Sequence, residues 1–192
     1  MLPRIGLVSF ALLLSLGCGG PGSFNGEVAG NKLSVNDAAF VSVPNATGGI
    51  GGVLLMMADV PDICADARAN RFRKNSTYVW MQAYRTQGTY PNEVYLSPDK
   101  GIYTVVADFA PPPSNFAYAS FIRTDANCFN VIDTARAYGK SGTVDLEAIQ
   151  FKTDGALTGK FDITFGTQND SAKGTFNASF CDAAYTDAAS CE

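Results

Sequence analysis

The sequence predicts an all-β protein: an antiparallel β-sandwich, or a sheet closing towards a barrel, with one short helix and a C-terminal β-meander. Apolar and polar residues alternate through much of the last fifty positions, turn-forming dipeptides recur between short apolar segments, and a continuous apolar run covers 50–58. Alternation with a period of two indicates strands with one buried and one solvated face. These three observations favour antiparallel strands over helices.

The meander is predicted from three strand-length segments at 141–151, 157–165 and 172–180. The second ends in FDITF and the third in TFNASF, so that large apolar residues alternate with polar ones. Turn signals, TDG and QNDS, separate the segments. We therefore expect three consecutive antiparallel strands with one core face.

Six further strands are predicted at 38–43, 50–58, 76–86, 102–109, 116–123 and 129–137. The run at 50–58 is apolar at every position except its glycines and should be buried on both faces. In 76–86, Tyr78, Trp80 and Tyr84 alternate with smaller apolar residues, which places the aromatic side chains on one face. The prolines at 111–113 cannot continue a sheet and predict an extended loop.

One helix is predicted at 61–71. Pro61 suits the first helical position, where its missing N–H costs no hydrogen bond. Asp62 lies near the positive N-terminal end of the helix dipole, and Arg68 and Arg71 lie near its negative C-terminal end.

The first seventeen residues have the pattern of an export signal. Arg4 is the only charged residue before Glu27, and twelve uncharged, mostly apolar residues follow it at 5–16. A helix of this length spans about 18 Å, against roughly 30 Å of bilayer hydrocarbon, and is too short to remain as a membrane span. Residues 1–17 are therefore expected to be a signal peptide outside the folded domain.

The end of this signal, Ser15-Leu16-Gly17-Cys18, resembles the lipobox of bacterial lipoproteins, and the chain resembles the small lipoproteins of Gram-negative bacteria. The resemblance implies that signal peptidase II cuts before Cys18, whose thiol carries lipid, with acyl chains such as palmitate. Ser15 and Leu16 stand in the reverse of the usual order. Ser15-x-Gly17 also fits ordinary signal cleavage, which would release a soluble secreted protein with a free thiol.

The chain after the signal is expected to have two parts. Residues 18–23 are glycine-rich and should form a flexible tether, and 24–192 should form one domain. In the lipoprotein class an aspartate after the cysteine favours retention in the inner membrane. Gly19 stands there and implies sorting to the outer membrane, in a periplasmic or surface-exposed orientation.

The five cysteines are Cys18, Cys64, Cys128, Cys181 and Cys191. An odd count in an exported protein leaves one thiol to explain. If Cys18 carries lipid, the other four can form two disulfides. A bridge from Cys64 to Cys128 would leave Cys181 and Cys191 to fix the C-terminal tail, and four cysteines also allow two other pairings.

Composition excludes several kinds of chemistry. The chain has no histidine, which removes Ser-His-Asp and Cys-His catalysis and most transition-metal sites. Its 18 acidic residues outnumber 14 basic ones, which argues against a nucleic-acid partner. Asp145 and Glu147 could act as a catalytic pair, but alternate acidic residues on a solvated strand face are commoner. No cofactor and no metal ion are expected.

Two groups of residues are candidates for a binding surface. Tyr78, Trp80 and Tyr84 could form a platform for sugar rings or a partner protein, or could line an inner sheet face. A basic cluster could meet anionic groups or be a solvated helix end, and its members are Arg68, Arg71, Arg73 and Lys74.

The sequence thus predicts a lipid-anchored, non-enzymatic binding or structural module of the cell envelope whose partner is an envelope protein or a glycan. The alternative is a soluble secreted inhibitor or a binder of solutes or glycans. A hydrolase that uses carboxylates is the least favoured reading.

Overall fold

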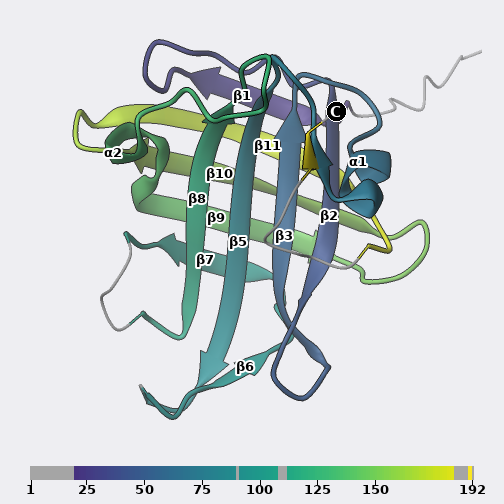
Figure 1. Cartoon of the computed structure of the whole chain (residues 1–192). Coiled ribbons are helices and arrows are strands. Elements are labelled where there is room, and N and C mark those ends of the chain that lie inside the picture. Colours follow the sequence, from purple (N-terminus) through teal and green to yellow (C-terminus); the bar gives the residue numbers. More distant parts are fainter. Residues whose placement is uncertain (1–19, 90, 108–111, 184–189, 192) are drawn as a thin grey trace, which may run out of the picture.

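The computed structural model describes residues 20–89, 91–107, 112–183 and 190–191, and within them one large sheet curls into a barrel (Figure 1). Eight strands close the barrel in the order β2-β3-β5-β8-β7-β9-β10-β11, with β11 returning to β2. The predicted all-β, barrel-like fold class is confirmed. Of the two predicted forms, the structure shows the sheet that closes into a barrel and not a sandwich of two separate sheets.

The described strands have the following bounds: β1 Gly22–Gly26, β2 Asp37–Pro44, β3 Ile50–Ala58, β4 Arg71–Phe72, β5 Thr77–Gln87, β6 Val94–Leu96, β7 Gly101–Val105, β8 Asn115–Arg123, β9 Gly139–Ile149, β10 Ala156–Phe165, β11 Asp170–Phe180 and β12 Ser190–Cys191. The helices are α1, Ile63–Ala69, and α2, Thr134–Ala137. The antiparallel run β9-β10-β11 confirms the predicted meander. The predicted strand 102–109 corresponds to β7, and its end at 108–109 lies outside the described residues.

Two junctions of the barrel wall are parallel and short. β7 meets β8, and β11 meets β2, through two residue pairs each, whereas the antiparallel pairs are longer. At the second junction β1 pairs with the other part of the same edge of β11, and the backbone N–H of Cys181 donates to the Phe40 carbonyl at 2.8 Å. At the first junction most of β8 lacks β7 as a neighbour, and the segment around α2 lies there instead.

The barrel interior is a packed core. Inward-facing side chains of all eight strands contribute to one buried cluster, in which Phe40, Phe121, Leu157, Ile163 and Phe165 are fully buried. Large apolar side chains therefore occupy the interior of this eight-stranded barrel.

A second apolar cluster covers the outside of β2, β3 and β5. It includes Val41, Leu54 and Ile63, and α1 packs over it. Because β3 faces the core on one side and this cluster on the other, it is buried on both faces, as its sequence predicted.

The helices differ from the prediction in two ways. α1 begins at Ile63 rather than Pro61, because the Asp37 carboxylate accepts the Ile63 N–H at 2.9 Å, and it ends where Asn70 turns left-handed. The predicted strand 129–137 is wrong: its second half is α2, which begins after Asp133. The Asp133 side chain accepts the Ala135 N–H and so caps this helix.

The described cysteines form two disulfides, as predicted, but the pairing expected first is wrong. Cys64 bonds to Cys181 and Cys128 bonds to Cys191. Cys181 follows β11 directly at the closing junction, next to α1, which carries Cys64. The barrel closure, which sequence spacing does not reveal, thus decides the pairing.

The first strand begins inside the segment 18–23 that was predicted to be a flexible tether. Gly22 and Ser23 belong to β1, and the Pro21 carbonyl accepts the Asn177 N–H at 3.0 Å. Among the described residues no helix is long and apolar enough to cross a membrane. Cys18 lies outside the described residues.

Candidate functional site

A groove of about 680 Å³ lies on the outer wall of the barrel, beside the short β7–β8 junction. It runs between the outer faces of β5 and β8 and the corner where α2 leads into β9. Its described lining residues are Phe72, Trp80, Gln82, Val106, Tyr118, Ala119, Ser120, Ile122, Thr124, Cys128, Phe129, Asn130, Ala137, Tyr138 and Gly139.

Aromatic side chains form the walls and rim of this groove. Trp80 stacks on Phe72, with ring centroids 5.0 Å apart and planes inclined by 18°. At the rim, Phe129 is 71% exposed and Tyr138 is 53% exposed. Exposed aromatic rings beside a concavity mark an interaction surface more strongly than scattered apolar residues do.

Some polar groups of the groove lack a protein hydrogen-bond partner in the described structure, among them groups of Trp80, Ser120 and Asn130. The Trp80 Nε1–H is buried and unpaired, and the Ser120 hydroxyl is unpaired as well. Asn130 uses its Oδ1 to accept the backbone N–H groups of Arg123 and Ile132, which leaves its Nδ2 without a partner. The Ser120 hydroxyl and Asn130 Nδ2 are hydrogen-bond donors available to a ligand, whereas Trp80 Nε1 is covered by protein and is not exposed to the groove.

The aromatic surface continues along β5 and β8. Tyr84 stacks on Phe116 at 5.4 Å, and its Oη donates to Gln82 Oε1 at 3.1 Å, which orients this groove amide. Tyr118 contacts both Tyr84 and Phe116 through its ring edge or face. The Gln82 side chain is therefore held on the groove wall.

Hydrogen bonds fix the two segments that border the groove. Asp125 Oδ1 accepts the Asn127 and Phe129 N–H groups at 2.7 and 3.0 Å and holds the loop before the rim. Asp170 Oδ2 accepts the Ala29 N–H at 2.9 Å and pairs with the α2 residue Arg136 at 2.7 Å. The Ala29 N–H and Arg136 lower the pKa of Asp170. The rim is thus tied to the barrel.

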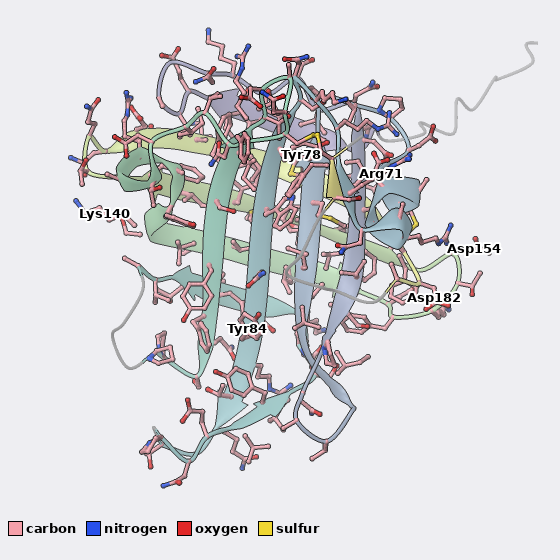
Figure 2. The ribbon with its side chains drawn as sticks, viewed as in Figure 1. Arg71, Tyr78, Tyr84, Lys140, Asp154 and Asp182 are labelled. Atoms are coloured by element: carbon pink, nitrogen blue, oxygen red, sulfur yellow. A yellow bond between two sulfur atoms is a disulfide. The ribbon has the colours of Figure 1, made fainter. Side chains whose placement is uncertain are left out.

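The three residues of the predicted aromatic platform have different surroundings in the structure. Tyr78, Trp80 and Tyr84 share the outer face, and Figure 2 places Tyr78 near α1 and Tyr84 further along β5. Tyr78 is only 3% exposed, its Oη accepts the Arg73 N–H at 3.0 Å, and burial raises its pKa. Only Trp80 of the three lines the groove.

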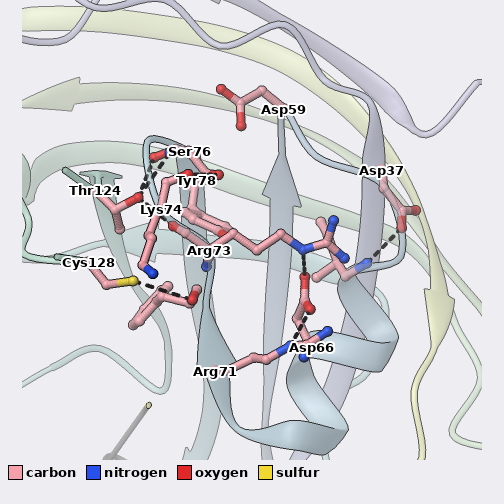
Figure 3. Close-up of polar contacts among 12 residues, drawn as sticks. Asp37, Asp59, Asp66, Arg71, Arg73, Lys74, Ser76, Tyr78, Thr124 and Cys128 are labelled. Atoms are coloured by element: carbon pink, nitrogen blue, oxygen red, sulfur yellow. Dashed lines mark hydrogen bonds and ion pairs between the residues drawn. The ribbon is translucent and has the colours of Figure 1, made fainter. Parts of the chain in front are cut away.

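Two residues of the predicted basic cluster, Arg71 and Arg73, form ion pairs with a buried carboxylate of α1. Asp66 on α1 is 3% exposed and pairs with Arg71 Nε at 2.8 Å and with Arg73 Nε at 2.6 Å (Figure 3). Arg68 and Lys74 are exposed. Two of the four cations therefore stabilise the covering of the barrel.

Asp145 and Glu147 lie on the outer face of β9. Lys160 on β10 is 3.2 Å from the Asp145 carboxylate and 3.6 Å from that of Glu147. The hydrogen bond to Asp145, together with the two negative charges, raises the pKa of Lys160. The three residues form a surface ion cluster.

Fold and groove together define the class: a closed β-barrel with a packed interior and an aromatic groove on its outer wall. No protein-family model, curated protein or solved structure matches the chain. In the part of the chain that the structure describes, no cluster of cysteine and acidic side chains has the arrangement of a metal site.

Most residues of the groove were not predicted from the sequence to be functional. Phe72, Tyr118, Phe129 and Tyr138 come from four separate segments, and only the barrel brings them together. One local signal was available. Aspartate is a favoured N-cap residue, so Asp133 could have indicated the start of a helix within the segment that was predicted to be a strand.

Proposed function

We propose that the protein is an exported lipoprotein, anchored through Cys18 to the outer membrane, and that it acts as a non-enzymatic binding module of the cell envelope. The groove is its binding site. The alternative, a soluble secreted inhibitor or binding protein, would use the same groove and differ only in its N-terminus.

The cysteine pairing supports the anchor. The two disulfides use Cys64, Cys128, Cys181 and Cys191, so that Cys18 is the one cysteine left for lipid. Acyl chains stabilise membrane attachment by about 0.8 kcal/mol per buried CH₂ group, and two or more chains make it lasting. With Pro21 already bonded to β11, the link between the anchor and the barrel spans only a few residues.

The mature protein is expected to begin at Cys18 with a diacylglyceryl adduct, and Cys18→Ser should release the domain from membranes. Intact-mass spectrometry of the purified protein and fractionation of the variant measure the two effects. A mature chain with an unmodified N-terminus at Cys18 or later would contradict the anchor and favour the secreted alternative.

The groove carries the proposal of binding. It combines an aromatic wall, exposed rim rings and unpaired donors, which is the usual composition of a ligand site. Its described lining holds no carboxylate, lysine or arginine, the groups that would serve as acid or base in a chain without histidine. This composition supports binding rather than catalysis.

A photo-crosslinking amino acid in place of Phe129 tests the groove in the native envelope. We expect irradiation of cells to attach envelope material to the protein at this position. The matched control places the same amino acid at Val94 on β6, which is 60% exposed and does not line the groove. Equal attachment from both positions, or none from position 129, would contradict the groove as the binding site.

A further inference from the structure

We infer that the ligand of the groove is an uncharged carbohydrate chain. The inference rests on the proposed binding function and names its ligand class. Three properties of the described lining lead to it: the absence of formal charge, the presence of unpaired hydrogen-bond donors, and flat aromatic walls.

The lack of charged side chains in the described lining argues against a charged ligand. None of the described residues that line the groove carries a formal charge, although the chain has 32 acidic and basic residues in total. Moving an anion or a cation out of water is unfavourable unless an opposite charge or several hydrogen bonds replace its hydration. The exposed cations Arg68 and Lys74 are not among the lining residues. A charged ligand would therefore lose hydration without a counter-charge.

The donors argue against a wholly apolar ligand. Trp80 Nε1, Ser120 Oγ and Asn130 Nδ2 have no partner in the described protein, and Trp80 Nε1 is shielded from water as well. A donor that a ligand covers without accepting its hydrogen bond loses its hydration without compensation. A hydrocarbon chain would impose this loss on Ser120 Oγ and Asn130 Nδ2. Hydroxyl, ring or acetamido oxygens of a sugar can accept from both of these donors.

The aromatic walls supply the remaining complementarity. The stacked pair of Phe72 and Trp80 and the rim rings of Phe129 and Tyr138 offer rigid apolar surfaces. Aromatic rings bury a large area at a small entropic cost, and a pyranose ring has an apolar C–H face that covers such a surface. The C–H faces of a sugar can therefore cover the rings, while its hydroxyl edges accept hydrogen bonds from the Ser120 and Asn130 donors.

The shape favours an oligosaccharide over a single sugar. A volume of about 680 Å³ lies within the usual range of ligand sites. Exposure of 71% at Phe129 and 53% at Tyr138 shows that the groove opens to solvent at these rings. A chain can therefore extend beyond the groove, whereas a monosaccharide would leave the rim rings uncovered.

The test uses the folded, disulfide-bonded protein and the fluorescence of Trp80, which is the single tryptophan of the chain. The probes are maltohexaose and chitohexaose, which are uncharged, and hexagalacturonate, which is acidic. We expect at least one uncharged probe to shift the emission in a saturable way that is insensitive to salt, and hexagalacturonate to have no such effect. Tyr138→Ala and Phe129→Ala should each weaken binding about tenfold, because each removes an aromatic contact.

Val94→Ala is the control, since Val94 on β6 is 60% exposed, lies outside the groove lining and should leave the affinity unchanged. The inference is overturned if neither uncharged probe binds at millimolar concentration, if hexagalacturonate binds equally, or if the groove variants bind as the wild type does. Crosslinking from position 129 separates the two proposals. Protein adducts alone would keep the groove as a binding site and refute the carbohydrate.

Discussion

Replacing both Cys64 and Cys181 with alanine is expected to lower the free energy of unfolding by about 4–5 kcal/mol, the chain-entropy value for so long a loop. The bond joins positions 117 residues apart, next to a junction at which β11 and β2 share only two residue pairs. The variant loses the covalent closure of this junction. Urea-induced unfolding of variant and wild type measures the difference.

The second disulfide provides the comparison. Cys128–Cys191 fixes the two-residue strand β12 beside β4, and removing it allows the tail to detach while the barrel stays closed. The freed tail gains entropy in the folded state as well, so that the Cys128→Ala/Cys191→Ala variant should lose less stability. If the Cys64/Cys181 variant unfolds at the wild-type urea concentration, the closing role of this bond is refuted.

Asp66→Asn is expected to lower the free energy of unfolding by about 2 kcal/mol. The Asp66 side chain is 4% exposed and pairs with Arg71 and Arg73, and the amide would remove the negative charge from both of these ion pairs. Breaking a buried ion pair costs about 3–5 kcal/mol, and a smaller loss is expected here because both arginines reach solvent. Thermal unfolding at neutral pH measures it.

Asp62→Asn is the matched control for this variant. Asp62 precedes α1 with φ of 61°, makes no capping hydrogen bond through its side chain, and is exposed. Asparagine tolerates this left-handed conformation well. Equal stability of the two variants would show that Asp66 is not the residue that holds α1 and β4 together.

The strands were largely predictable because local patterns determine them. The alternation in 157–165 and 172–180 reappears as β10 and β11, and the uninterrupted run at 50–58 is β3 with both faces covered. Such patterns report which face of a strand is buried. They do not report which strand lies beside it.

The features that depend on distant neighbours were not predictable. The parallel β7–β8 and β11–β2 junctions follow from barrel closure, and they decide both the position of the groove and the pairing of Cys64 with Cys181. The sequence correctly placed Tyr78, Trp80 and Tyr84 on one face. Only the structure shows that α1 and β4 cover Tyr78, while Trp80 remains on the groove wall.

The most direct measurement of the central claim, that the groove is the ligand site, follows the indole N–H resonance of Trp80 by NMR. The chain has one tryptophan, so this group gives one signal. We predict that the uncharged hexasaccharide that binds moves this signal in a saturable manner, and that Tyr138→Ala raises the concentration required about tenfold. A signal that stays in place while the protein is saturated with ligand would contradict the account.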